Sequence, residues 1–396
     1  MTDERDFYAI MKDSEEKYMD AEESNKLIKN KKVFSANYMP DTVYHRDAEI
    51  KKLTEHFIAT RHQKYCSDLS IYGVTGSGKT LVTKMVFRTL AKGVQDSYYI
   101  FVSCNEHSTS QAIASYILSC ISGNGKGWGV SNIIQQIKKV IEDKLLVLIF
   151  DEIDLFLKGN KANEQLIQIF SDWNNCVMVF ISNDPAWHNL IKDHRTISRL
   201  HLTNMIFEPY EKYQIFDILK DRSKLGLVSD VTTDDDLLAI AEFSAQYSGD
   251  ARVAIKLLAQ TVSYAENAHK KMINFKILER AIHNLEDDNQ MNFIESLPPQ
   301  QLLILAAIYV VNSRMGKSDF DMVYSEYRKM LRDSKNWRVL SKNTIRVYID
   351  ELQTYGLIRK EVGKGRGRGK GREATLIFPT FDTVKFHDRV IKEMEI

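Results

Sequence analysis

A glycine-rich segment with a lysine and a threonine stands at residues 73–80, where the sequence reads GVTGSGKT. It fits G-x-x-x-x-G-K-[ST] at every fixed position, follows an apolar run at 69–72 and precedes a helix-like stretch at 81–90. In that setting backbone N–H groups surround a phosphate, helped by the positive end of the next helix. The pattern predicts a nucleoside triphosphate site, with ATP or ADP and Mg²⁺ as cofactors. Its candidate residues are Gly73, Val74, Thr75, Gly76, Ser77, Gly78, Lys79, Thr80 and Leu81.

Within this segment Lys79 would reach the β- and γ-phosphates, and the Thr80 hydroxyl would hold Mg²⁺. The apolar run LLVLIFDE then ends in two carboxylates, Asp151 and Glu152. Asp151 would hold Mg²⁺ through water, and Glu152 would polarise the attacking water. Alone, such a run could be a solvated strand end, but its position downstream of the glycine-rich segment favours the catalytic interpretation. Asp154 is expected to be a helix-starting or surface acid.

Four further polar residues could complete the site. Asn183 follows the apolar run 177–181 and could hydrogen-bond the γ-phosphate or orient water, although a lone Asn is usually a turn residue. Arg195 and Arg199 are candidates for an arginine finger that points to a neighbour's γ-phosphate, with a surface salt bridge as an equally good alternative. Arg252 lies in the first turn of a helix that begins near SGDAR, with Gly249 and Asp250 at its cap, and could reach back onto the phosphates.

The elements that must position these residues follow a simple order. Short apolar runs alternate with helical stretches between residues 33 and 207, which indicates a parallel sheet covered by helices. These runs are 69–72, 98–102, 145–150, 177–181 and 202–207. From Tyr210, itself a candidate nucleotide contact, to about residue 285 the pattern is that of successive amphipathic helices. Residues 1–32 carry nine acidic and seven basic side chains and are typical of a mixed-charge arm.

The C-terminal hundred residues have a different character. Three helices are expected at 299–311, 320–331 and 341–355, and two β-like runs at 356–362 and 374–379. Ser341 resembles an N-cap, and the helix after it is the natural recognition helix of a DNA reader. Its candidate DNA contacts are Lys342, Asn343, Thr344 and Arg346.

The two runs flank a tip in which glycines alternate with basic residues, and this predicts a β-hairpin or wing. Its candidate DNA contacts are Lys364, Arg366, Arg368, Lys370 and Arg372. A disordered basic linker or an RNA-binding Gly-Arg segment are the alternatives, but three helices followed by a hairpin favour a winged-helix domain. Arg366 and Arg368 are the best candidates for the minor groove.

Composition sets the outer limits of the interpretation. The 396 residues are 44% hydrophobic and 27% charged, with a net charge of +1, as expected for a globular protein of two or three domains. No apolar run approaches a membrane span, and the first residues lack the pattern of a signal peptide. Four scattered cysteines argue against a zinc site or a disulfide framework. We therefore expect a cytoplasmic, nucleoid-associated protein that does not engage a membrane.

The motifs GVTGSGKT, LIFDEID, ISND, R-x-x-S-R-L and SGDAR, in that order, resemble the AAA+ ATPases, and more narrowly the archaeal origin-recognition/cell-division-control replication initiators. Residues 37–53 also resemble the family's box that packs near the adenine. The resemblance implies that Lys79 and Thr80 contact phosphate and Mg²⁺, and that Asp151 and Glu152 are the catalytic acids. It further implies Asn183 as sensor one, Arg252 as sensor two, and Arg199 ahead of Arg195 as the finger.

Two parts of the chain depart from the family pattern. The sensor-two helix reads GDARVA where the family often has two adjacent arginines, and a glycine-rich tail, GNGKGWG, follows the stretch after the second strand. The resemblance implies an inserted, DNA-touching helix in this region, with Lys126 and Trp128 in its loop. An ordinary core helix followed by a turn is the alternative.

Together these features predict an α/β fold: a parallel-sheet P-loop domain of the AAA+ class, a small all-helical lid and a C-terminal winged helix. The expected boundaries are 1–34 for the arm, 35–208 for the nucleotide-binding domain, 209–292 for the lid and 293–396 for the winged helix. The expected function is an ATP-regulated initiator, a weak ATPase whose partners are double-stranded origin DNA, a paralogous initiator subunit and the replicative helicase. A motor ATPase, an ATP-dependent transcription regulator and a transposition-helper ATPase are the alternatives.

Overall fold

The computed structural model describes residues 26–63, 67–92, 97–123, 128–142, 144–159, 161–332, 338–364 and 373–392. The chain forms two compact units, the first ending at Leu278 and the second beginning at Glu279. No helix in these ranges is both long enough and apolar enough to cross a membrane.

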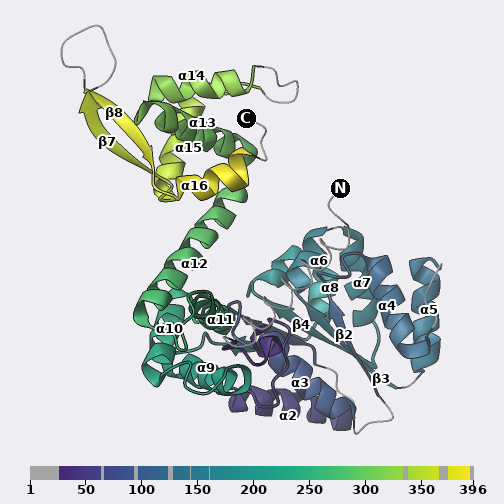
Figure 1. The fold of residues 1–396 in the computed structure, drawn as a ribbon. Coiled ribbons are helices and arrows are strands. Elements are labelled where there is room, and N and C mark those ends of the chain that lie inside the picture. Colours follow the sequence, from purple (N-terminus) through teal and green to yellow (C-terminus); the bar gives the residue numbers. More distant parts are fainter. Residues whose placement is uncertain are drawn as a thin grey trace, which may run out of the picture. The chain divides into compact units, whose positions relative to one another are not determined.

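The first unit is built on a five-stranded parallel sheet, as predicted (Figure 1). The strands lie in the order β2-β3-β4-β1-β5, and their bounds are β1 Leu69–Gly73, β2 Ser97–Ser103, β3 Leu145–Asp151, β4 Cys176–Ser182 and β5 Thr203–Phe207. Central β3 is buried on both faces because helices cover both, which explains its continuous apolar run. The pairing of Asp151 with Ile181 brings the carboxyl ends of β3 and β4 to the same edge.

Helices cover the two faces of this sheet (Figure 1). They are α2 Asp47–Gln63, α3 Lys79–Ala91, α4 Ser110–Ser122, α5 Val130–Ile141, α6 Ile153–Gly159, α7 Lys161–Ser171, η2 Trp187–Leu190 and α8 His194–Arg199. The short helix η1 Lys31–Phe34 packs against the lid instead. Val147 and Ile149 of β3 pack against α2 and α3, whereas Leu146, Leu148 and Phe150 pack against α4 to α7. Successive side chains of β3 thus point to opposite faces of the sheet and contribute to the hydrophobic core on each face.

A helical lid follows the sheet, as predicted, and its helices are α9 Lys212–Gly226, α10 Asp234–Tyr247, α11 Ala251–Asn267 and the start of α12 Phe275–Glu295. We call residues up to β5 the base. The first described residues pack on the lid: Leu27 and Ile28 donate their N–H groups to Glu266 Oε1 at 2.7 and 3.0 Å. Ile28 also pairs with Leu227. Part of the expected arm is therefore fixed to the lid.

The second unit contains the predicted winged helix. Its elements are α13 Pro299–Met315, β6 Ser318–Asp319, α14 Phe320–Met330, α15 Lys342–Thr354, β7 Ile358–Lys364, β8 Glu373–Pro379, α16 Thr383–Phe386 and the π-helical η3 His387–Ile391. The strands form a three-stranded antiparallel sheet in the order β6-β8-β7. Ile345 and Ile349 of α15 are buried against α13 and α14, which leaves the opposite side of α15 exposed.

Candidate functional site

The glycine-rich loop joins β1 to α3 in a backbone conformation that needs glycine. Gly76 and Gly78 have φ values of +72° and +92°, in the left-handed region. α3 begins directly at Lys79, and no side chain caps its first N–H groups. Among the described residues the buried Oγ of Ser77 also has no hydrogen-bond partner. Uncapped donors and an unpaired hydroxyl in a glycine cradle fit a phosphate group.

Two residues, Tyr210 before the first lid helix and Asp250 before α11, lie close to this loop. A Cβ on Gly76 would lie 1.6 Å from Oδ1 of Asp250, and a Cβ on Gly78 would lie 2.9 Å from the Tyr210 hydroxyl. The glycines therefore serve contact with the lid as well as contact with a ligand. The sequence singled out Tyr210 as a nucleotide contact and placed Asp250 at a helix cap, but it did not predict that Asp250 meets Gly76. Asp250 does cap α11, by accepting the Arg252 N–H at 2.7 Å.

Lys79 gathers the polar groups at the edge of the sheet. Its Nζ donates to the carbonyls of Gly73 and Val74, each at 2.8 Å, and to Asn183 Oδ1 at 3.0 Å. Burial, followed by repulsion from Arg252, lowers the pKa of Lys79 to about 8. The structure thus joins residues from β1, α3 and β4 that sequence reasoning assigned to one site. Gly73 and Val74 contribute by holding Lys79.

The residues expected to hold Mg²⁺ also meet. The Thr80 hydroxyl donates to Asp151 Oδ1 at 3.0 Å. Burial raises the pKa of Asp151, and the Thr80 hydrogen bond opposes that effect. A hydroxyl beside a carboxylate is a donor set that suits a hard divalent cation. Glu152 follows with a φ of +59°, an unfavourable backbone conformation for a residue with a side chain.

Asp154 has a more specific role than the expected surface acid. It lies in the first turn of α6, as predicted, but its Oδ1 accepts a hydrogen bond from Ser182 Oγ at 2.9 Å. The same Ser182 oxygen accepts the Asp184 N–H at 3.0 Å. These two bonds fix the chain on both sides of Asn183, where β4 ends. The sequence signal was a serine, buried in the structure, at the end of an otherwise apolar strand.

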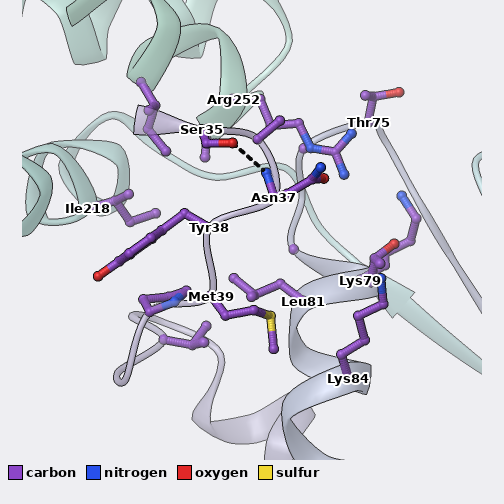
Figure 2. Close-up of a pocket in the computed structure, with 18 of the residues that line it drawn as sticks. Ser35, Asn37, Tyr38, Met39, Thr75, Lys79, Leu81, Lys84, Ile218 and Arg252 are labelled. Atoms are coloured by element: carbon purple, nitrogen blue, oxygen red, sulfur yellow. Dashed lines mark hydrogen bonds between the residues drawn. The ribbon is translucent and has the colours of Figure 1, made fainter. Parts of the chain in front are cut away.

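A cavity of about 740 Å³ opens above these groups, within the size range of ligand pockets. Its walls come from the base, the lid and the segment that follows η1. They include Thr75, Gly76, Gly78, Lys79, Thr80, Leu81, Asp151, Glu152, Asn183, Tyr210 and Arg252. Figure 2 shows Tyr38 and Met39 on one wall and Lys79 on another, with Arg252 reaching from the lid towards Thr75. Ile218 of α9 also lines the cavity and was not predicted.

Arg252 is one of three lid cations that line this cavity, together with Arg222 and Lys256. Its guanidinium makes no hydrogen bond or ion pair with the other described residues. Arg195 and Arg199, by contrast, do not line the cavity. Both lie on α8, and Arg199 forms an exposed ion pair with Asp172 at 2.6 Å. Within one chain the two finger candidates are therefore separate from the cavity.

The recognition-helix candidates lie at the start of α15. Ser341 caps the helix, as predicted, by accepting the Thr344 N–H at 3.2 Å. Arg346 donates to Asn343 Oδ1 at 3.3 Å, and Lys342 forms an ion pair with Asp321 at 3.0 Å. These side chains are held near each other on the exposed first turns of α15.

An aromatic pair on α14 supports the two cations and was missed in the sequence. Phe320 and Tyr324 stack, and the Arg346 guanidinium lies 4.5 Å from the Phe320 ring centroid. Lys342 lies 5.2 Å from the Tyr324 centroid. Their spacing of four residues on a predicted helix was the available signal, but it is typical of core packing as well.

The wing candidates are described only in part. β7 and β8 pair from Ile358 with Pro379 to Lys364 with Glu373, so the predicted hairpin is present. Arg366, Arg368, Lys370 and Arg372 lie outside the described residues, as does Lys126. Trp128 is described, exposed, and accepts a hydrogen bond from Gln111 Nε2 at 2.6 Å through its carbonyl.

Comparison with known proteins agrees with this arrangement. Residues 62–188 match an AAA domain, residues 216–283 match the Cdc6 AAA+ ATPase-type lid domain, and residues 292–385 match the CDC6 C-terminal winged helix domain. An AAA domain of this kind binds a nucleotide together with a divalent metal.

Full-length relatives and a solved structure extend the similarity. The ORC1-type DNA replication protein 1 of Methanosarcina acetivorans is 28% identical over 91% of this chain and 90% of its own length. The ORC1-type protein of Thermococcus kodakarensis is 29% identical, over 89% and 88%. The structure of the Aeropyrum pernix ORC1 protein in complex with DNA has the same fold, with a TM-score of 0.68, 22% identity and coverage of 93% and 99%. The chain belongs to the AAA+ replication initiators of the archaeal origin-recognition/cell-division-control family.

Proposed function

We propose that this initiator is a nucleotide-regulated switch that binds double-stranded origin DNA through its winged helix and helps to recruit or load the replicative helicase. One observation carries the switch: Lys79, Asn183 and Asp151 of the base face the same cavity as Arg252 of the lid. A group that contacts both parts would bias their relative arrangement, because it binds one arrangement better than the others.

ATP with Mg²⁺ is the proposed ligand, and when bound it supplies a γ-phosphoryl group that water can attack. Lys79 and Arg252 would hold the phosphates, and Thr80 and Asp151 would hold the metal. Glu152 would accept a proton from the attacking water, and Asn183 would orient that water. The wall that contains Tyr38 and Met39 suits the base of the nucleotide.

Hydrolysis by one chain alone should be slow. Arg195 and Arg199 do not line the cavity within the described chain, so an arginine for the transition state would come from a neighbouring initiator subunit. The proposal therefore includes a paralogous partner that meets this face, with Arg199 as the first candidate for the finger that this chain offers to the partner's site.

The DNA reader rests on a separate set of observations. α15 presents Lys342 and Arg346 on its exposed first turns, and the β7–β8 hairpin leads to a tip rich in arginine and lysine. A relative of the same fold was solved in complex with DNA. Helix N-terminal residues suit base edges in the major groove, and a basic hairpin suits phosphates and the minor groove.

Genome-wide footprinting with Mg·ATP, with Mg·ADP and without nucleotide tests the proposal. We expect a few discrete sites near the replication origin, with occupancy that depends on the nucleotide. Lys79→Ala should keep the sites and lose the nucleotide dependence, whereas removal of residues 363–372 should lose the sites. Binding that ignores DNA sequence would contradict the initiator function, and sites spread over many promoters would favour a transcription regulator.

A further inference from the structure

Arg46 is a buried cation outside the nucleotide cavity, and it connects the glycine-rich loop to the lid. It precedes α2 and is only 3% exposed. Its Nε donates to the Ser77 carbonyl of the loop at 3.1 Å, and its Nη2 donates to the Glu208 carbonyl at 2.6 Å. Glu208 begins the connection between base and lid (residues 208–211), so one guanidinium holds both segments.

The same guanidinium lies against two aromatic rings, one at the end of β5 and one in that connection. Its central carbon is 4.0 Å from the Tyr210 ring centroid and 5.5 Å from that of Phe207. Glu49 neutralises the charge through an ion pair at 3.0 Å. A planar guanidinium can donate in several directions and stack at the same time, whereas a lysine ammonium cannot reproduce this set.

Tyr210 carries the connection onward to the lid helix that presents Arg252. Its N–H donates to the Gly249 carbonyl at 3.2 Å, and a Cβ on Gly249 would lie 2.7 Å from the Tyr210 carbonyl oxygen. Gly249 immediately precedes Asp250, the cap of α11. An unbroken series of contacts therefore runs from Ser77 through Arg46 and Tyr210 to the start of α11.

We propose that Arg46 is a positioning residue that transmits the state of the glycine-rich loop to the start of α11, in parallel with the direct reach of Arg252 into the cavity. This inference rests on the proposed nucleotide switch and adds a second route to it. A loop that shifts when it closes on phosphate moves the Ser77 carbonyl. Arg46 links that carbonyl to Glu208 and Tyr210, so the base–lid connection must follow.

A purely structural role for Arg46 predicts a different result. Loss of a buried, paired cation would lower stability, whatever the nucleotide. Transmission requires instead that the response of the lid to a nucleotide is lost. The readout must therefore be the change that Mg·ADP produces at residues 248–254, compared with the change at residues 73–80.

Amide hydrogen exchange of the full chain, with and without Mg·ADP, gives both changes at once. In the native protein Mg·ADP should slow exchange in both segments. Arg252→Ala removes the direct route and should retain part of the slowing at 248–254. Adding Arg46→Lys to the Arg252→Ala variant should abolish the slowing that remains at 248–254, while Mg·ADP should still slow exchange at 73–80. Arg46→Lys alone should weaken Mg·ADP affinity roughly tenfold, the equivalent of one charge-assisted hydrogen bond.

Asp68→Asn is the stability control. Asp68 is also a buried charged residue of the base, and it accepts the Met178 N–H at 2.8 Å but does not line the cavity. Its contacts avoid the glycine-rich loop, so this variant should keep the slowing at 248–254. If Arg46→Lys fails to fold, Tyr210→Leu removes the stacking partner and should reduce the same response.

Equal slowing at 248–254 in Arg252→Ala and in the Arg46→Lys, Arg252→Ala double variant would overturn the inference. Complete loss in Arg252→Ala alone would also overturn it, because the direct route would then be sufficient. If the native protein itself shows no response to Mg·ADP in either segment, the proposed nucleotide switch fails instead.

Discussion

Oδ1 of Asp250 occupies the place that a side chain at position 76 would need: a Cβ on Gly76 would lie 1.6 Å from it. The carboxylate belongs to the cap of the lid helix α11, and the glycine belongs to the loop of the base. The lid thus leaves no room for a side chain at this position of the loop. A substitution at Gly76 must therefore displace either the loop or the start of α11.

We expect Gly76→Ala to displace Asp250 and weaken Mg·ADP binding by well over tenfold, as measured by calorimetry. Gly123→Ala is the control, because Gly123 has a similar φ of +75° but nothing within 4 Å of its added Cβ. That variant should lose only about 1–2 kcal/mol of stability from the left-handed backbone. Equal effects of the two variants on nucleotide binding would refute the role given to the contact.

The lowered pKa of Lys79 predicts a pH dependence of nucleotide binding. The free protein holds Lys79 with a pKa of about 8, against 10.5 in an unperturbed lysine. Phosphate favours the charged ammonium, so above pH 8 binding must take up a proton, and affinity should fall as pH rises from 7 to 9.5. The fall can reach about tenfold per pH unit for one proton. Calorimetry in two buffers of different ionisation enthalpy should show proton uptake at pH 9 and little at pH 7.

The strained backbone of Glu152 predicts that a glycine at this position raises stability and removes activity. Its φ is +59°, so Glu152→Gly should relieve strain and stabilise the fold by up to about 1 kcal/mol while ATP hydrolysis is lost. Asp230→Gly is the control, because Asp230 has a φ of +63° away from the cavity. It should stabilise the fold without affecting hydrolysis. Thermal unfolding and phosphate release measure the two properties, and unchanged hydrolysis in Glu152→Gly would exclude a catalytic role.

The sequence predicts the base and the winged helix well because their signals are local. A continuous apolar run such as β3 indicates a strand buried on both faces, and a fixed motif such as residues 73–80 sets the spacing of glycines and lysine. The order of the motifs also placed Asn183 and Asp151 at the same edge of the sheet.

Contacts between distant segments were beyond this reasoning. Arg46 lies in the segment 37–53 that resembles the family's adenine box, but only the fold shows that it meets Ser77 and Tyr210. Asp154 was expected at a helix start, but its partner Ser182 comes from the next strand. A buried polar contact depends on which segments the topology brings together, and the residues that flank each partner in the sequence do not indicate this.

The aromatic pair on α14 predicts cooperation between Phe320 and Arg346 in DNA binding. The guanidinium stacks on the ring at 4.5 Å, so Phe320→Leu should free Arg346 and weaken binding about two- to fivefold. Arg346→Ala should weaken it more, and the double variant should match Arg346→Ala alone. Titration of origin DNA at several salt concentrations measures this cycle. Additive losses would show that the ring acts independently of the arginine.

The hydrogen bond from Ser182 to Asp154 predicts an effect on catalysis that leaves binding intact. Ser182 Oγ fixes the backbone at Asp184 and is itself held by Asp154, so Asn183 depends on both for its direction. Ser182→Ala should lower kcat for ATP hydrolysis by about tenfold, since misplacement of a positioning group costs rate, while Lys79 and Thr80 keep the nucleotide bound. Asp154→Asn retains an acceptor oxygen and should lose less. A rise in KM with unchanged kcat would instead place these residues in nucleotide binding. As a control, Asp172→Asn removes an exposed ion pair with Arg199 and should change neither constant in the isolated chain.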